Sequence, residues 1–205
     1  MKLFKLTNYL LLAIITLVTS CANNEKKVMI LVKGNVTVDE AAKTIVVKDG
    51  VGNTEKEMTF NTADKISLQL TTPNKQATID IAENGYYILN AKNDTIIGSY
   101  QNYGAAPTSA IVITQATLKK GIDSLIQLTE NKNISAANRN YFILPYTAVK
   151  ITNNANAFIV APYHKMSSIE KEGDKEPEVY RFWSIKEIRQ TIVDRVKDTV
   201  LVIKK

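Results

Sequence analysis

The sequence predicts a mainly β protein of the α+β class, with an antiparallel β-sandwich-like half followed by an α+β half with two helices. Two observations lead to this prediction. Short segments of strand periodicity, separated by turn residues, follow one another as far as Tyr100, whereas helical periodicity is confined to the second half. The chain has 205 residues, 45% of them hydrophobic and 22% charged, as in an ordinary globular protein with one large domain or two small ones.

The first 21 residues differ from the rest of the chain. Lys2 and Lys5 make the start positive, and residues 9–18 are an apolar run interrupted only by Thr16. A membrane-spanning helix needs about 20 apolar residues, so a run half as long is typical of the apolar region of a signal peptide. The chain's one cysteine, Cys21, follows this region.

The tetrapeptide Val18-Thr19-Ser20-Cys21 resembles the lipobox of bacterial lipoprotein signal peptides. The resemblance implies that residues 1–20 are a signal peptide, cleaved between Ser20 and Cys21, and that Cys21 is attached to membrane lipid through acyl chains such as palmitate. Cys21 is then an anchor and not a nucleophile. The alternatives are an ordinary signal peptide with an incidental cysteine, or a buried N-terminal helix.

The residues after Cys21 bear on location. Ala22 stands where Asp would retain a Gram-negative lipoprotein at the inner membrane, so resemblance to that sorting rule favours the outer membrane. Residues 21–27 are expected to be a tether of about 20 Å at about 3.3–3.6 Å per residue. The tether lacks the acidic run associated with surface export in the Bacteroidetes, so comparison with that group favours the periplasm-facing side, with the cell surface as the alternative. Lys26 and Lys27 are expected to be solvated or to touch lipid head groups.

The β-sandwich-like domain is expected over residues 28–100. Residues 28–32 and 44–48 are continuous apolar runs, typical of strands covered on both faces, whereas residues 65–70 and 76–81 alternate. Further strands are predicted over 86–89 and 95–98. Five dipeptides mark the turns: Asp49-Gly50, Gly52-Asn53, Pro73-Asn74, Asn84-Gly85 and Asn93-Asp94.

Residues 101–109 are the predicted linker to an α+β region of residues 110–205. Apolar residues at helical spacing predict helices over 115–130, after Thr114 as cap, and over 185–197, where Ser184-Ile185-Lys186-Glu187 has the form of a capping box. Whether the two halves share one core stays open. Strands are predicted over 111–113, 141–144, 148–151, 158–160, 179–183 and 199–203.

Patterns of catalysis and metal binding are absent from the sequence. His164, the one histidine, has no Gly-x-Ser-x-Gly turn to supply a nucleophile, so we interpret it as a surface loop residue. One His and one Cys exclude multi-histidine and cysteine-rich metal sites, and no phosphate-binding or Ca²⁺-binding loop is found. No catalytic residue, metal ligand or cofactor is assigned, although carboxylates distant in the sequence can meet in the fold.

The aromatic residues allow two interpretations. Tyr86, Tyr100, Tyr103 and Trp183 are candidates for an aromatic surface that stacks a sugar or contacts a peptide. Alternatively, the aromatic residues seal the junction between the two halves. Strand alternation sends Tyr87 one way and Tyr86 the other, so one of them must be less buried or covered by the second half.

Three tripeptides, Asp94-Thr95-Ile96, Asp123-Ser124-Leu125 and Asp198-Thr199-Val200, resemble the O-glycosylation sequon of exported Bacteroidetes proteins. The resemblance makes Thr95, Ser124 and Thr199 candidate acceptors. Ser124 is the weakest of them, because it falls in the middle of a predicted helix. The alternative is that the three are ordinary turn and helix residues.

Together these features predict a lipid-anchored cell-envelope protein that acts as a non-enzymatic binding or scaffold module for an envelope protein or glycan. The alternative is a hydrolase or transferase of envelope glycans with carboxylates that the sequence does not pair. The 26 basic and 20 acidic residues are interspersed, which argues against nucleic acid as a partner. Cys21 is expected to be the sole membrane attachment, since the mature chain has only strand-sized apolar runs.

Overall fold

The computed structural model of the protein describes residues 24–102, 115–165, 176–190 and 192–194. The strands of the first half are β1 (Glu25–Asp39), β2 (Thr44–Asn61), β3 (Ile66–Thr71), β4 (Gln76–Ile81), β5 (Gly85–Asn90) and β6 (Ile96–Gln101). They are followed by α2 (Gln115–Thr129), β7 (Asn140–Ile143), β8 (Thr147–Thr152), β9 (Phe158–Val160) and β10 (Val179–Ser184). A second helix covers 185–190 and 192–194.

The predicted class is confirmed: the described chain is mainly β, with two sheets and two helices. The helix expected over 115–130 is α2, and the described part of the second helix begins at the predicted residue. The strands predicted over 111–113 and 199–203, most of the linker and the end of the second helix lie outside the described residues.

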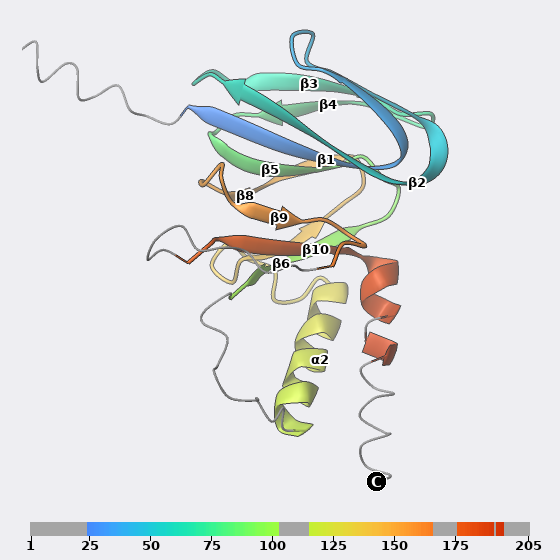
Figure 1. The fold of residues 1–205 in the computed structure, drawn as a ribbon, viewed down its shortest axis with the longest axis vertical. Helices are drawn as coiled ribbons and strands as arrows, with labels where there is room; N and C mark the ends of the chain where they lie inside the picture. The colour runs from blue at the N-terminus through green and yellow to red at the C-terminus, as the bar shows by residue number, and fades with distance from the viewer. Residues whose placement is uncertain (1–23, 103–114, 166–175, 191, 195–205) are drawn as a thin grey trace, which may run out of the picture.

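The first sheet has the order β4-β3-β2-β1-β5-β8. Its outer strands, β4 and β8, contact each other, so the sheet is rolled around its own interior (Figure 1). The pairs β1–β5 and β2–β3 are parallel, which corrects the antiparallel pairing expected for residues 28–100. The alternating pattern that identifies a strand is the same for both directions of pairing, so it carries no information about the neighbour.

β1 and β2 are longer than the runs that predicted them, because a bulge bends them instead of ending them. The register shifts between Lys33 and Asn35. Gly34 lies there with φ +102°, and a Cβ on it would be 2.5 Å from the Lys48 carbonyl oxygen. Opposite, the predicted turn residues 49–53 bend β2 without leaving the strand. Bulges increase strand twist, which helps the sheet to roll.

The start of β1 corrects the expected tether. β1 begins at Glu25, so residues 25–27 belong to the sheet. Lys26, expected to be solvated or at the lipid surface, is fully buried. Its Nζ donates to the Thr62 carbonyl oxygen and to Asn84 Oδ1, each at 2.7 Å. These bonds tie the first strand to the loops before β3 and β5, so the chain is ordered close to Cys21.

The core inside the rolled sheet is formed by the alternating residues of its strands. The predicted inward set Ile66, Leu68 and Leu70 belongs to it. Residues 28–32 are covered on both faces as expected, since Ile30 is in this core and Leu31 in the next. Residues 44–48 are not covered on both faces: Ile45 and Val47 are buried, but Thr44 and Val46 are only half-buried and Lys48 is exposed.

The second sheet has the order β7-β6-β10-β9 and packs against the outer face of the rolled sheet. The core between them takes residues from both predicted halves, including Tyr86 and Ile88 of β5, Tyr141 of β7, and Tyr180 and Phe182 of β10. β8, from the second half, pairs with β5. The two halves therefore share a core: the chain enters the second sheet at β6, returns to the first at β8 and enters the second again at β9.

The two helices make the third layer (Figure 1). Leu128 of α2 and Ile188 of the second helix pack against Ile97 and Trp183, on the far face of the second sheet. Ser184 caps the second helix as predicted, because its Oγ accepts the Glu187 backbone N–H at 3.1 Å. In the described part of the chain, neither helix is long and apolar enough to cross a membrane.

Candidate functional site

The residues of the predicted aromatic surface do not form one surface. Tyr86 is buried between the sheets, and Trp183 is buried under the helices. Tyr100 is half-buried, with its ring edge-on to Tyr180 at 5.6 Å and the Arg139 guanidinium 4.5 Å from its ring. This is the arrangement of the second interpretation, in which aromatic residues pack the junction. Tyr103 lies outside the described residues.

Two of the modification sites expected from the sequence, Thr95 and Ser124, lie among the described residues. Thr95 is half-buried, and its carbonyl oxygen accepts the Ile185 backbone N–H at 3.3 Å. Ser124 is exposed in the middle of α2. Thr199, Ser20 and Cys21 lie outside the described residues, so their assignments stay predictions.

His164 is a loop residue whose Nε2 lies 2.8 Å from Glu55 Oε1. The hydroxyl of the neighbouring Tyr163 lies 2.7 Å from Ser184 Oγ, and Ser184 is buried and caps the second helix. The His164 imidazole is 60% exposed. This exposed position agrees with the interpretation of His164 as a surface loop residue.

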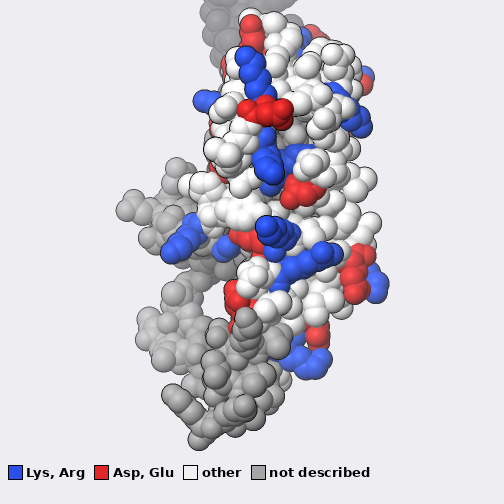
Figure 2. Space-filling model, turned by 90° about the vertical axis from the view of Figure 1, so that its right-hand side faces the viewer, with Lys and Arg blue, Asp and Glu red and all other residues white. Residues whose placement is uncertain are grey.

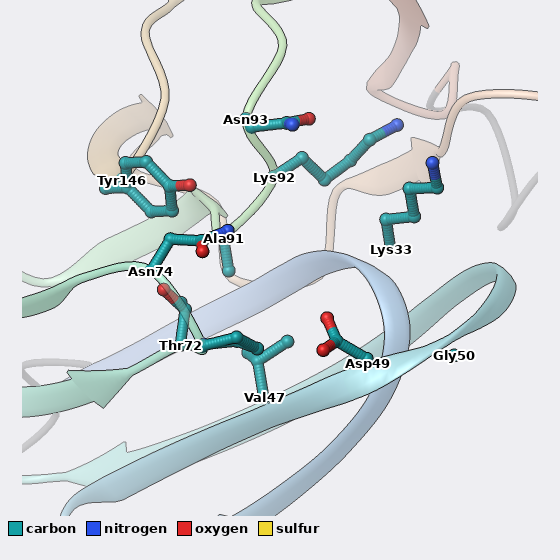
Figure 3. A pocket seen from close by; sticks show the side chains of 11 residues that line it. Lys33, Val47, Asp49, Gly50, Thr72, Asn74, Ala91, Lys92, Asn93 and Tyr146 are labelled. Atoms are coloured by element: carbon teal, nitrogen blue, oxygen red, sulfur yellow. The ribbon is translucent and has the colours of Figure 1, made fainter.

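A cavity of about 240 Å³ lies at the end of the rolled sheet where β5 ends (Figure 3). We call it the open-end cavity. Five segments line it: Lys33 of β1; Val47, Asp49 and Gly50 of β2; Thr72, Pro73 and Asn74 after β3; Ala91, Lys92 and Asn93 after β5; and Tyr146 before β8. Three of the predicted turns thus meet at one place.

The floor of the open-end cavity is apolar. Val47 and Ala91 are buried members of the core inside the rolled sheet, and Tyr146 packs against that core. The cavity therefore continues the hydrophobic interior of the sheet outward to a polar rim. A bound group would meet carbon atoms below and hydrogen-bonding groups around it.

Asn90 holds the loops that form this rim. Its side chain is fully buried and donates to the carbonyl oxygens of Asp94 at 2.8 Å and Ile143 at 3.1 Å. Its Oδ1 accepts the Lys92 backbone N–H, and its carbonyl oxygen accepts the Tyr146 N–H at 2.7 Å. The Asn90 side chain thereby ties the loop after β5 to the end of β7, and its backbone carbonyl holds the loop before β8.

Lys92 is the most constrained of the lining side chains. It is 5% exposed, and its Nζ lies 3.2 Å from Asn53 Oδ1 and 3.6 Å from Asp94 Oδ1. The same ammonium lies 5.5 Å from the centre of the Tyr163 ring. Lys92 therefore contributes its carbon chain to the wall, while its charge is engaged elsewhere.

Five other lining side chains have no hydrogen-bonding partner among the described residues. Within the described part of the chain, no hydrogen bond or ion pair joins these groups to another protein group. Figure 3 shows the Tyr146 hydroxyl and the Asn74 amide turned toward Ala91, with Asp49 on the other wall. The groups are the Lys33 ammonium, the Asp49 carboxylate, the Asn74 and Asn93 amides and the Tyr146 hydroxyl.

The cavity offers binding groups but no pair of carboxylates. Asp49 is its single acid. In two other hollows of the described chain the wall also holds one acid, Asp123 beside α2 and Glu55 beside β2. The described residues contain no group of three or more His, Cys, Asp or Glu arranged to hold a metal ion. Figure 2 shows basic and acidic side chains interleaved over the described part of one face.

No family model, curated protein or solved structure matches this chain. Sequence reasoning missed the open-end cavity, although it identified as turns Asp49-Gly50 and Pro73-Asn74, which line it, and Asn93-Asp94, of which Asn93 lines it. The sequence signal that could have located the cavity was the set of polar turn residues next to strands that share a core.

Proposed function

We propose that this chain is a lipid-anchored protein of the bacterial cell envelope that binds part of an envelope glycan or protein in the open-end cavity, without catalysing a reaction. The observation that carries the proposal is that five polar side chains without a hydrogen-bonding partner among the residues that the structure describes, each from a separate segment, line one cavity with an apolar floor. Small-molecule sites generally combine an apolar lining with a few polar groups that set specificity.

The position of the cavity relative to the proposed anchor supports this function. Only residues 22–24 separate Cys21 from β1, a reach of about 10 Å at about 3.3–3.6 Å per residue. β1 pairs with β5 from Lys26 to Leu31, about 17 Å at about 3.3 Å per residue, and the cavity lies beyond that pair. Acyl chains on Cys21 would hold the start of β1 at the bilayer and direct the cavity away from it.

The proposed location is the outer membrane, with the cavity facing the periplasm. It rests on the lipobox resemblance, on Ala22 after the cysteine and on the lack of an acidic run in the residues that follow. The cell surface is the alternative location. Two acyl chains or more would make the attachment stable, because one chain alone gives only reversible binding.

The number of carboxylates in the cavity favours binding over glycan hydrolysis. Glycoside hydrolysis needs two carboxyl groups about 5–9 Å apart on either side of the bond that breaks. Asp49 alone lines the open-end cavity. A polar site with one carboxylate can orient a ligand but lacks the second group of that mechanism.

The proposal is tested with the chain from Ala22 onward, which retains every described strand and helix. Incubated with isolated cell envelopes and centrifuged, it should be retained in the pellet. The double variant Asp49→Ala/Asn93→Ala should be retained about 10-fold less, since two hydrogen bonds contribute about 0.5–1.5 kcal/mol each.

The matched control is Asp64→Ala/Asn156→Ala, which removes one acid and one amide from exposed loops outside the cavity. It should be retained like the unchanged chain. Equal retention of both double variants, or no retention of the unchanged chain, would contradict the proposed function.

A further inference from the structure

The rim of the open-end cavity carries charges of both signs. The Lys33 ammonium and the Asp49 carboxylate both line it, and the Lys92 ammonium is already engaged with Asn53 and Asp94. A ligand with a net negative charge would be attracted by Lys33 and repelled by Asp49. A cation would be attracted by Asp49 and repelled by Lys33. The arrangement therefore favours a ligand without net charge.

The neutral groups on the rim both donate and accept hydrogen bonds. The Asn74 and Asn93 amides and the Tyr146 hydroxyl each offer both functions, and Asp49 adds an acceptor and Lys33 a donor. Adjacent hydroxyl groups of a ligand can satisfy such a set, because each hydroxyl also donates and accepts. Lys33 and Asp49 are exposed, where an ion pair contributes only about 0–1 kcal/mol, so hydrogen bonding should dominate recognition.

The size and floor of the cavity limit the ligand further. Its volume of about 240 Å³ is below the range of about 300–1,000 Å³ for drug-sized ligands, so it holds one small ring. Val47, Ala91 and Pro73 offer carbon surface to the C–H groups of that ring. One face of the Tyr146 ring is already covered by Lys75 Nζ, 5.1 Å from its centre, so Tyr146 presents its edge and hydroxyl.

We propose that the open-end cavity binds a single uncharged saccharide unit, held by hydrogen bonds between its hydroxyl groups and Asp49, Asn74, Asn93, Tyr146 and Lys33, with Lys33 as donor and Asp49 as acceptor. This inference rests on the proposed binding function and names its ligand class. The unit would belong to a glycan of the envelope, entering from the side of the molecule away from the start of β1.

The test is calorimetric titration of the processed lipoprotein in a detergent without a sugar head group. The probes are glucose, galactose, mannose and N-acetylglucosamine, compared with glucuronate, glucosamine and free amino acids. At least one neutral sugar should bind, with an affinity that changes less than about twofold between about 50 and about 500 mM NaCl, because screening acts on charge pairs. Asn93→Ala and Asp49→Asn should each weaken it about 3- to 10-fold.

Two comparisons keep the result interpretable. The exposed variant Asn156→Ala should bind like the unchanged protein, and equal thermal midpoints should show that the cavity variants are folded. Binding only of glucuronate, glucosamine or a zwitterionic amino acid, with strong salt dependence, would overturn the saccharide inference. Sugar binding that is unchanged in both cavity variants would show that the sugar does not bind in this cavity.

The envelope-retention experiment separates the two proposals. If retention depends on Asp49 and Asn93 but no neutral sugar binds, the saccharide inference is wrong and the binding function stands. If neither retention nor sugar binding depends on these residues, both proposals are wrong.

Discussion

Single buried polar side chains organise the two ends of the rolled sheet. At the start of β1, Lys26 donates to the loops before β3 and β5, and at the other end Asn90 joins the loops around the cavity. Burying such groups costs free energy unless they are hydrogen-bonded. Each side chain therefore fixes the position of its partners, and the partners fix the side chain. The two residues that accept these bonds from Lys26 are more than 30 positions away in the chain.

Glu178 is another residue whose role depends on distant partners. Burial acts to raise the pKa of Glu178, but hydrogen bonds from Tyr180, Thr152 and Asn154 outweigh burial and lower it below its usual 4.5. The Tyr180 hydroxyl and Thr152 Oγ1 both donate to one carboxylate oxygen, at 2.6 and 2.8 Å. The carboxylate links β8 to the start of β10.

Replacing this carboxylate should change the pH dependence of stability. Because the pKa of folded Glu178 lies below that of the unfolded chain, its stabilisation is present above about pH 4.5 and is lost as the pH falls through the folded pKa. Glu178→Gln should lower the free energy of unfolding by about 1–3 kcal/mol at neutral pH.

The difference between wild type and Glu178→Gln, measured by urea unfolding between about pH 3 and pH 7, should shrink toward zero at the acid end. Glu130→Gln is the matched control, since the Glu130 side chain is 48% exposed in its pair with Lys132. A Glu178→Gln difference that stays constant across the pH range would contradict the assignment.

At the scale of elements, the close packing of β6 on β10 explains a glycine inside a strand. Gly98 lies opposite Phe182 in the β6–β10 pair. A Cβ at Gly98 would lie 2.1 Å from the Phe182 ring. Phe182 in turn belongs to the core between the two sheets, where it lies 6.1 Å from the Tyr141 ring.

Gly98→Ala should therefore destabilise the protein by about 1–3 kcal/mol, as overpacking of a core does. The measurement is the free energy of unfolding in urea. Adding Phe182→Leu to Gly98→Ala should recover part of the loss, so that the double variant is more stable than the sum of the two single changes predicts. Simple addition of the two effects would show that the contact is not the cause.

At the scale of the whole molecule, the layered packing uses the apolar faces of both helices within the fold. Leu128 and Ile188 direct the apolar faces of α2 and the second helix against the second sheet. A helix that lies in a membrane surface needs that face for lipid. The attachment proposed for the molecule is accordingly the acylated Cys21 alone.

Lone anchoring is tested with vesicles of extracted envelope lipid. The processed lipoprotein should float with the vesicles, whereas the chain produced without residues 1–21, behind a cleavable secretory signal, should stay in the soluble fraction even at low salt. Changing Cys21→Ser should block lipid transfer, leaving the protein soluble or attached by its uncleaved leader. Flotation of the chain without residues 1–21 after a high-salt wash would show a second membrane-binding surface.

The local elements were determined by the sequence itself. Alternation placed Ile66, Leu68 and Leu70 on one face, and the capping pattern placed the start of the second helix at Ser184. Tyr87 and Tyr86 point to opposite faces as alternation requires, one into the rolled sheet and one into the core between the sheets. These features depend on residues a few positions apart, where periods of 2 and 3.6 and capping groups are decisive.

Only the tertiary structure decided which strands pair, that β1–β5 and β2–β3 are parallel, and that the sheet closes on itself. It also decided that Lys26 is buried, that Trp183 lies beneath the helices and that three turns surround one cavity. The physical reason is that each depends on contacts between segments far apart in the chain. A strand has the same alternation whatever its neighbour, and a turn residue has the same local conformation whether it faces solvent or lines a site.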